Sequence, residues 1–412
     1  MDKKEYLKQG EINLIEDNKW SFKRKLCTII LILIGIILLI LIIFTLIIGI
    51  KYSKLYIQSG YEEPWNDLYG NRTINIPYFK NNQIINTFKK NGDNYNETMG
   101  EINDGKDYPK NERNYYDLYI PYSSTKNKDK YNGIILFIHG GSWQYGDKNM
   151  MSYLCSRYAK MGYITATLSF TLLGKKESNI FRILDEITSC IESIKEQLKS
   201  QGFNENQLGI AIGGTSSGAH LAMLYSYSIK KSPIPIKFVI NNVGPVSLEP
   251  EYWYKLKNKN KTLENIEPDD IEKAINNSNI VKIFDNEINL LKYMNLFIGK
   301  KYNDKQLKGM IKDKKINVNN DEYKKLYKIV YKTFPYNFIN KIPTLCIYGG
   351  NDFIIGVAHY SKLKKLFKKN IELVYMRYGG HMLLSPDTEN GLHANREMHY
   401  QILNFSKTYF KS

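Results

Sequence analysis

The chain has 412 residues, of which 43% are apolar and 13% aromatic, so it can bury the core of one large catalytic domain with appendages and is not a disordered protein. Its formal net charge of +17 comes from 58 Lys and Arg against 41 Asp and Glu. These charges are scattered, and no basic stripe alternates with stacking aromatic residues, which argues against a nucleic-acid partner. The positive charge is compatible with attraction to an anionic membrane surface.

The cysteines show neither a metal-binding nor a redox pattern. They stand at positions 27, 155, 190 and 346, with no C-x-x-C pair, and a disulfide framework is therefore not implied. A single bridge, such as Cys155 to Cys190, stays open as an alternative. His359, His393 and His399 do not combine with nearby carboxylates into a ligand set, so we expect neither a metal nor another cofactor.

The first element that we expect is a transmembrane helix at Leu26–Ile50. This run carries no charge and consists mostly of Ile and Leu, and at about 1.5 Å per residue it exceeds the ~30 Å core of a bilayer. A cleaved signal peptide fits less well, because the apolar run is too long and no small-x-small cleavage site precedes Lys51. The sequence therefore predicts a signal-anchor, with residues 1–25 as a cytoplasmic tail.

Charges around the apolar run predict its orientation. Lysines at 51 and 54 follow the run and soon give way to glutamates at 62 and 63, whereas the residues before it are strongly basic. This bias favours a cytoplasmic N-terminus, which would place the catalytic part on the extracytoplasmic side, either lumenal or extracellular. The basic residues in front of the run are Lys19, Lys23, Arg24 and Lys25.

Residues 51–111 differ from the rest of the chain after the apolar run. They are rich in Asn, Lys and Tyr and contain turn-forming pairs such as Asn91-Gly92. We interpret them as a stalk with some local structure. Order is expected to begin at Asn114–Pro121, where an alternating pattern closed by a proline predicts a strand.

From Asn114 onward, apolar strand patterns alternate with helical ones. Gly133–Ile138 is apolar throughout, as expected of a strand buried on both faces, and Ile180–Gln201 has apolar residues at helical spacing. This alternation predicts an α/β fold over residues 112–412, with a largely parallel sheet and helices on both of its faces. Further strands are expected at 163–170, 208–212, 237–241, 344–348 and 372–376, and further helices at 152–161 and 394–409.

Residues 250–335 interrupt the alternation. They are charged and mostly helical in pattern, with short apolar runs at Ile288–Phe297 and Leu326–Tyr331. We interpret this insertion as a cap or lid that shapes the substrate pocket. Surface decoration without a role in substrate binding is the alternative.

The motif Gly214-Thr215-Ser216-Ser217-Gly218 carries the clearest chemical signal. It lies between an apolar strand and a helical run, so a tight turn would lift Ser216 out of the sheet edge, as the G-x-S-x-G pattern of a nucleophilic serine requires. Both glycines are expected to be needed sterically, because the chain packs closely on each side of the serine. Ser217 does not fit the pattern, because no glycine flanks it at the required spacing.

Downstream, an acid and a histidine each follow a predicted strand. Asp352 comes after the strand 344–348, and His381 comes after the strand 372–376. In enzymes whose nucleophilic serine follows a strand of a mostly parallel sheet, the catalytic residues occur in the chain order serine, acid, histidine. Ser216, Asp352 and His381 stand in this order. We therefore predict Ser216 as nucleophile, His381 as general base and then acid, and Asp352 as the group that orients His381.

An oxyanion hole needs N–H donors where negative charge develops on the substrate. The backbone N–H groups of Gly141, Ser142 and Ser217 are the candidates, because the loop after the strand 133–138 and the start of the helix after Ser216 should converge. We expect His139 to hold this loop by hydrogen bonds and His220 to brace the helix. Neither histidine is given a catalytic role.

With these motifs located, the segment from about Asn114 to the C-terminus resembles the α/β-hydrolase superfamily and, within it, the hormone-sensitive-lipase-like and bacterial esterase/lipase group. The loop His139-Gly140-Gly141-Ser142-Trp143-Gln144 is similar to loops of that group and of kynurenine-formamidase-like enzymes. Departures from the pattern are Ser142 in place of the third loop glycine, and Thr215 and Ser217 at the usual acidic and alanine positions. They concern the substrate class more than catalysis.

The sequence therefore predicts a membrane-anchored serine hydrolase that cleaves a small-molecule carboxylic ester through an acyl-enzyme. Two alternatives stay open. The H-G-G-x-W-Q loop is compatible with an amidase that acts on an N-formyl aromatic substrate. A binding or scaffold protein with the fold but without the activity is the second alternative.

Overall fold

The computed structural model divides into two units, residues 1–59 and residues 60–412. The first unit is described only over one helix, and the second over most of the segment that the sequence predicted to be catalytic. The described residues are 25–45, 65, 67–78, 113–175, 178–248, 287–338, 341–350, parts of 352–383, and 388–411, with side chains of the last helix described from residue 398.

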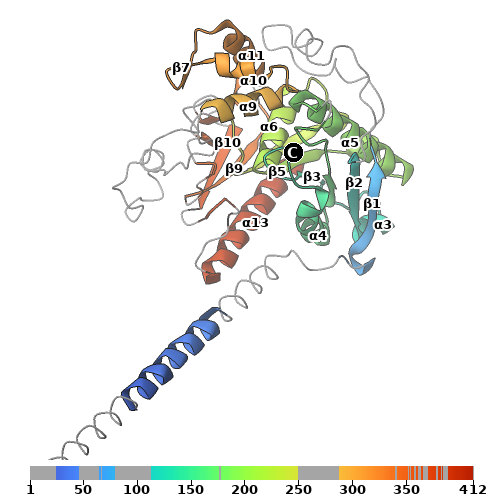
Figure 1. Ribbon diagram of the computed structural model, residues 1–412. Helices are drawn as coiled ribbons and strands as arrows, with labels where there is room; N and C mark the ends of the chain where they lie inside the picture. Colours follow the sequence, from blue (N-terminus) through green and yellow to red (C-terminus); the bar gives the residue numbers. More distant parts are fainter. Residues whose placement is uncertain are drawn as a thin grey trace, which may run out of the picture. The chain divides into compact units, whose positions relative to one another are not determined.

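The first unit contains an exposed apolar helix, Lys25–Thr45 (Figure 1). Its 21 residues have a mean hydropathy of 3.6, and at about 1.5 Å per residue they extend roughly 30 Å, which is long enough to cross the core of a bilayer. The helix covers residues 26–45 of the predicted run and begins one residue earlier, at Lys25. Residues 46–50 of that run, and the predicted cytoplasmic tail before Lys25, lie outside the described residues.

The second unit is built on an eight-stranded, mostly parallel sheet. Its strands are β1 (Gly70–Pro77), β2 (Tyr115–Pro121), β3 (Ile134–Ile138), β4 (Ile164–Leu168), β5 (Ile210–Thr215), β6 (Ile236–Asn242), β9 (Thr344–Gly349) and β10 (Ile371–Met376). They lie in the order β1-β2-β4-β3-β5-β6-β9-β10. β2 pairs antiparallel with both β1 and β4, and the other neighbouring pairs are parallel, which confirms the predicted α/β architecture.

Helices cover both faces of this sheet (Figure 1). On one face, α5 (Ile180–Ser200) and α6 (Ser217–Ser228) share a core with alternate side chains of β3. On the other face, α4 (Ser152–Lys160) and α13 (Thr388–Phe410) share a second core with the intervening β3 side chains. Successive residues of a strand point to opposite faces, so a strand between two cores must be apolar throughout, as β3 is.

β1 lies inside the segment 51–111 that the sequence indicated as a stalk, so that interpretation does not hold for residues 70–77. The strand is mostly exposed and therefore lacks the alternating apolar pattern that announces a strand. Charge and backbone hydrogen bonds hold it instead. Arg72 lies 3.6 Å from the buried carboxylate of Asp117 on β2, and the Asn75 amide donates to the same carboxylate at 2.9 Å.

The two cysteines for which the sequence left a bridge open are not bonded to each other. Cys155 on α4 and Cys190 on α5 are both buried and free. They belong to the cores on opposite faces of the sheet, so the sheet itself lies between their thiols.

The described part of the insertion, residues 287–335, forms a small helical layer, which we call the cap. It lies at the top of Figure 1. Apolar side chains of its first and last helices join the same core as α5 and α6, so the cap is packed onto the sheet domain. Its elements are α9 (Glu287–Phe297), α10 (Asp304–Gly309), the hairpin of β7 (Ile311–Lys312) and β8 (Lys315–Ile316), and α11 (Asp321–Tyr331).

Candidate active site

Ser216 stands at a strained turn between β5 and α6. Its backbone has φ +56° and ψ −122°, a conformation that costs a residue with a side chain about 1–3 kcal/mol. A Cβ on Gly214 would lie 2.3 Å from the carbonyl carbon of Gly218, and a Cβ on Gly218 would lie 2.1 Å from the carbonyl oxygen of Ile138. The expectation that both glycines are needed sterically is therefore confirmed.

The structure brings Ser216, His381 and Asp352 into one chain of hydrogen bonds. His381 Nε2 lies 3.0 Å from Ser216 Oγ, and His381 Nδ1 lies 2.9 Å and 3.1 Å from the two carboxylate oxygens of Asp352. When Nδ1 carries the ring proton and donates a hydrogen bond to the carboxylate, Nε2 has a free lone pair that faces the serine hydroxyl. This arrangement can accept a proton from Ser216.

The Asp352 carboxylate is buried and held by backbone donors. Its Oδ1 accepts hydrogen bonds from the amides of Ile354 and Ile355, each at 2.8 Å, in addition to the contact with His381. A carboxylate that accepts several N–H hydrogen bonds is fixed in orientation. The loop after β9 therefore presents this carboxylate as a rigid acceptor.

Two loops must lie side by side for this contact, and glycines allow it. β9 and β10 are parallel neighbours, so their C-terminal ends meet at the same edge of the sheet. Gly350 donates its amide to the carbonyl of Met376 at 2.9 Å. A Cβ on Gly349 would lie 2.1 Å from the carbonyl oxygen of Gly379, so a larger residue there would push the two loops apart.

The loop that follows β3, residues 139–145, lies directly beside Ser216; we call it the oxyanion loop. A Cβ on Gly140 would lie 2.9 Å from the Thr215 carbonyl oxygen and 3.3 Å from Ser216 Cβ. Within the described residues, neither the Gly141 nor the Ser142 amide donates to a protein acceptor. Both amides are therefore available to a ligand beside the serine.

Hydrogen bonds to neighbouring carbonyls set the direction of these two amides. Gly140 O lies 2.8 Å from His139 Nδ1, and Gly141 O accepts from the amides of Gln144 and Tyr145 at 3.0 and 2.9 Å. In a trans peptide the N–H points opposite to the C=O of the same unit. Fixing the carbonyls of residues 140 and 141 therefore fixes the N–H groups of residues 141 and 142.

His139 holds the loop as an uncharged side chain. Its ring is fully buried and stacks on Phe170, with the ring centroids 4.3 Å apart. Burial lowers its pKa to about 4, so at neutral pH it is an imidazole that donates Nδ1–H to Gly140 O. The expected positioning role agrees with this geometry.

His220 links α6, the helix that begins directly after Ser216, to the oxyanion loop and to the cap. Its Nδ1 accepts from Trp143 Nε1 at 3.3 Å, and its Nε2 lies 2.9 Å from the carbonyl of Thr333. Burial lowers the pKa of His220 to about 3, which keeps the ring neutral and leaves one nitrogen as donor and the other as acceptor. The predicted bracing role thus extends beyond the helix itself.

Tyr293 on α9 is a neighbour of the oxyanion loop that sequence reasoning missed. Its hydroxyl donates to the carbonyl of Ser142 at 2.6 Å, across a separation of 151 positions in the chain. In the sequence it is one tyrosine among 33, inside a helix whose apolar pattern indicates only packing. No local signal distinguishes a residue whose partner is so distant.

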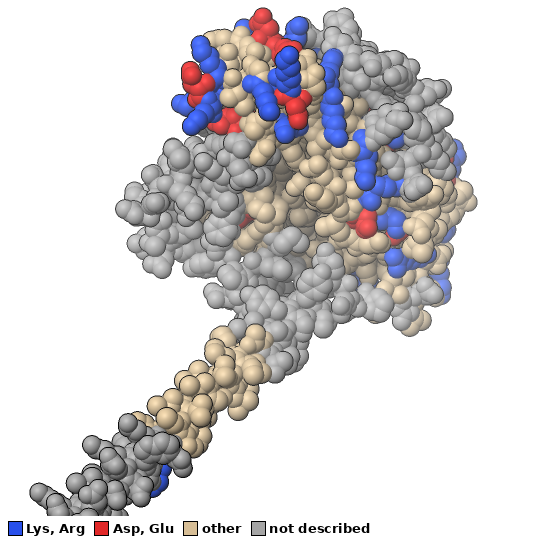
Figure 2. Space-filling view, viewed as in Figure 1, with Lys and Arg blue, Asp and Glu red and all other residues tan. Residues whose placement is uncertain are grey.

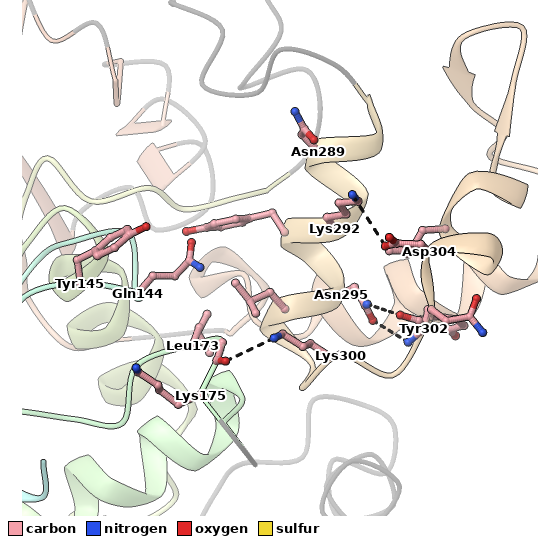
Figure 3. A pocket seen from close by; sticks show the side chains of 15 residues that line it. Gln144, Tyr145, Leu173, Lys175, Asn289, Lys292, Asn295, Lys300, Tyr302 and Asp304 are labelled. Atoms are coloured by element: carbon pink, nitrogen blue, oxygen red, sulfur yellow. Dashed lines mark hydrogen bonds and ion pairs between the residues drawn. The ribbon is translucent and has the colours of Figure 1, made fainter. Parts of the chain in front are cut away.

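A pocket of about 700 Å³ lies between the cap and the loops that follow β3 and β4 (Figure 3). Lys292 on α9 lies 3.9 Å from Asp304, and Lys300 donates to the carbonyl of Gly174 at 3.4 Å. Lys and Arg side chains, with fewer Asp and Glu, gather on the cap (Figure 2). The side chains of the Ser216, His381 and Asp352 chain do not line this pocket.

No group of three His, Cys, Asp or Glu side chains in the described parts of the chain is arranged to bind a metal ion.

A family model named BD-FAE matches residues 116–367, which is more than half of the chain. The chain belongs to the BD-FAE family. This is an esterase family of the α/β-hydrolase type, so the resemblance implied by the sequence motifs is confirmed. The match to the BD-FAE model includes Ser216 and Asp352 and ends before His381.

A segment of 110 residues is 30% identical to the "Probable isoprenylcysteine alpha-carbonyl methylesterase ICME" of Oryza sativa subsp. japonica. It covers 27% of this chain and 25% of that protein, so the chain spans about a quarter of the length of this relative.

Two solved structures share the fold with this BD-FAE member. Esterase B from Lactobacillus Rhamnosis (HN001) has a TM-score of 0.52 and 14% sequence identity, with 88% of this chain and 92% of that chain covered. A truncated carbohydrate esterase from gut microbiota has a TM-score of 0.50 and 14% identity, with 85% and 100% covered. At this level of identity the likeness establishes the α/β-hydrolase fold.

Proposed function

We propose that the protein is a serine hydrolase that cleaves small-molecule carboxylic esters and is anchored in a membrane by its N-terminal helix. The observation that carries the proposal is the chain of hydrogen bonds from Ser216 through His381 to Asp352. Membership of an esterase family supports the same class of reaction. The two structural relatives are esterases, which agrees with it.

In the first half of the reaction, Ser216 Oγ bonds to the carbonyl carbon of the ester while its proton moves to His381 Nε2. The carbonyl electrons move onto the oxygen, which becomes an oxyanion. The N–H groups of Gly141, Ser142 and Ser217 stabilise this charge. The bond to the alcohol oxygen then breaks, and the proton on His381 goes to the leaving alkoxide, which leaves an acyl group on Ser216.

In the second half, water replaces the alcohol. His381 takes a proton from the water as its oxygen attacks the acyl carbon, and the same amides hold the second oxyanion. The bond to Ser216 Oγ breaks, and the proton returns from His381 to the serine. Asp352 keeps the Nδ1 proton in place and stabilises the imidazolium form throughout both halves.

Active-site labelling tests the catalytic part of this proposal. The full-length chain in detergent micelles should react with a fluorophosphonate probe and hydrolyse short p-nitrophenyl esters. Ser216→Ala should lose both, with a fall in kcat of at least about 10⁴-fold, because nucleophile and base act as a unit. An unlabelled wild type, or equal turnover by wild type and Ser216→Ala, would refute it.

The same assay separates ester from amide hydrolysis. N-formylkynurenine, an N-formyl aromatic amide, can be offered beside the ester panel under the same conditions. Preferential turnover of the esters supports the proposal. Preferential turnover of N-formylkynurenine, lost in Ser216→Ala, would replace it with the amidase alternative.

The anchor is the second part of the proposal. The helix Lys25–Thr45 is apolar and exposed over its whole length, and basic residues precede it, so we place the N-terminus in the cytoplasm and the catalytic domain in a lumen or outside the cell. The chain should stay in the membrane pellet after alkaline carbonate extraction, and its catalytic domain should be protected from protease in sealed, cytoplasmic-side-out vesicles. Release by carbonate, as for a cleaved signal sequence, would refute the anchor.

A further inference from the structure

Every carbonyl of the oxyanion loop from Gly140 to Trp143 has a hydrogen-bond partner. The carbonyls of Gly140 and Gly141 are held from within the loop, and that of Trp143 accepts from the Leu173 amide at 2.8 Å. The carbonyl of Ser142 is different, because its donor is the Tyr293 hydroxyl of the cap at 2.6 Å.

The segment that Tyr293 contacts is under backbone strain. Ser142 has φ +53° and Trp143 has φ +59°, so two consecutive residues with side chains adopt the left-handed conformation. Each such residue costs about 1–3 kcal/mol and persists only where its surroundings hold it. A glycine would adopt this conformation freely. Ser142 stands where the similar loops of the hormone-sensitive-lipase-like and bacterial esterase/lipase group carry their third glycine. The chain therefore needs an external contact at this position.

The same helix also packs on the side chain of the second strained residue. The Trp143 ring makes edge-to-face contacts with Phe297 and Tyr293, with ring centroids 4.8 Å and 6.0 Å apart. Tyr293 and Phe297 are four positions apart, so they lie on one face of α9. One face of a cap helix thus contacts both strained residues, one through a hydrogen bond and the other through its ring.

We propose that Tyr293 is a positioning residue for the oxyanion hole, an inference that rests on the esterase function proposed above. Its hydroxyl holds the Ser142 carbonyl, which fixes the peptide between Ser142 and Trp143. The left-handed backbone at these two residues is thereby kept from relaxing, so the preceding peptides that carry the Gly141 and Ser142 amides stay in place. The cap accordingly contributes to transition-state stabilisation and not only to the shape of the pocket. Without the hydroxyl, the loop samples relaxed conformations in which the amides point elsewhere.

Tyr293→Phe tests the proposal, because it removes the hydroxyl and keeps the ring contacts. In full-length protein, kcat for a p-nitrophenyl ester should fall about tenfold, less than the roughly 10²-fold loss that follows deletion of an oxyanion donor. KM should stay within about twofold, since the amides act on the transition state more than on the bound ester. Tyr331→Phe, the same change at an exposed tyrosine on α11, is the matched control and should leave kcat unchanged.

A second measurement separates positioning from a structural role. Affinity for a boronic acid that forms a tetrahedral adduct with the serine should fall in Tyr293→Phe by about the same factor as kcat/KM, with the melting temperature within about 3 °C of wild type. If the wild type is active and Tyr293→Phe has the same kcat, the positioning role is overturned. It is also overturned if the fall in kcat of Tyr293→Phe comes with an equally large rise in KM and a fall in melting temperature. A wild type without activity would instead overturn the esterase function.

Discussion

The two sides of the candidate site are positioned in different ways. On the triad side, Ser216, Asp352 and His381 each follow the end of a strand, and close backbone contacts at glycines set the spacing of their loops. On the oxyanion side, the loop that carries the amides of Gly141 and Ser142 is held by side chains, namely the buried His139 within the loop and the partly buried Tyr293 from the cap.

The two sides are therefore sensitive to different kinds of substitution. A turn packed backbone to backbone cannot accept a Cβ, but it depends little on its other side chains. A loop held by side-chain hydrogen bonds depends on the chemistry of its donors and on the long-range packing that delivers them. Substitutions on each side, and a change of pH, test this contrast.

Asp352→Asn should cause the largest loss among changes that spare the nucleophile. Because an amide in this place no longer enforces the proton on His381 Nδ1, kcat should fall about 10³–10⁴-fold with little change in KM. Ester turnover of the purified variant measures this. A loss smaller than tenfold would show that the carboxylate does not orient the histidine.

Gly349→Ala should damage the triad side through the backbone alone. The added Cβ would lie 2.1 Å from the Gly379 carbonyl oxygen, so the loops that carry Asp352 and His381 must separate. We expect a fall in kcat on the order of 10²-fold, because displacement of about 1 Å has this effect, and a loss of stability of about 1–3 kcal/mol. Turnover and denaturant unfolding measure the two effects.

Gly309→Ala is the matched control for this change. A Cβ on Gly309 would have no neighbour within 4 Å, so turnover and stability should stay close to wild type. Equal losses in the two variants would contradict the argument that the contact between the two loops positions the triad.

Asp117→Asn should destabilise the part of the fold that adjoins the oxyanion loop. Asp117 is fully buried and binds Lys148 at 2.8 Å, just after the oxyanion loop, as well as Arg72 on β1. Removing one partner of a buried pair leaves the other charge uncompensated, so the free energy of unfolding should fall by about 3 kcal/mol. Lys324→Gln, which breaks the exposed pair with Asp321, should cost less than about 0.5 kcal/mol in the same denaturant titration. If Asp117→Asn and Lys324→Gln lowered the free energy of unfolding by the same amount, the role given to burial would be refuted.

Mild acid should weaken the oxyanion side by a smaller amount. Burial lowers the pKa of His139 to about 4 and that of His220 to about 3, against about 6.5 in an unfolded chain. Between these values the unfolded chain binds protons that the folded chain does not. Stability should therefore be full above about pH 6.5 and fall as the pH is lowered toward 4; between pH 6.5 and 5.5 the loss should be at most about 1.4 kcal/mol for each histidine.

Denaturant unfolding at pH 6.5 and 5.5 measures this dependence. His220→Gln should show a shallower fall than wild type, because one of the buried imidazoles is gone. A slope that does not change in the variant would contradict the assignment of the effect to His220.

Much of the triad side could be predicted from the sequence because its signals are local. Each strand is a short apolar run, and the glycines beside Ser216 are steric requirements that appear in the motif itself. The chain order of serine, acid and histidine then follows from the strand order of the fold. The residues that the sequence indicated are the ones that the structure brings together.

The sheet edge was harder to predict. β1 is exposed along most of its length and pairs with β2 at a separation of about 40 to 50 residues, so neither an apolar pattern nor a tight turn marks it. Its hold on the sheet includes contacts of Arg72 and Asn75 with the buried Asp117. Only the folded structure brings those groups together, and the stalk interpretation failed there for that reason.

By itself, the sequence determined the apolar helix, the strand and helix pattern of the α/β fold, and the positions of the strained serine and of the candidate acid and histidine, because each of these signals lies within one short segment. It also indicated that His139 holds the oxyanion loop and that His220 braces the following helix. The tertiary structure alone decided that burial keeps both rings neutral, and that the hydroxyl of Tyr293 holds the same loop. The physical reason is range. Steric and hydrophobic patterns are written along neighbouring positions, whereas a hydrogen bond between Tyr293 and Ser142 exists only once the cap is packed on the sheet domain.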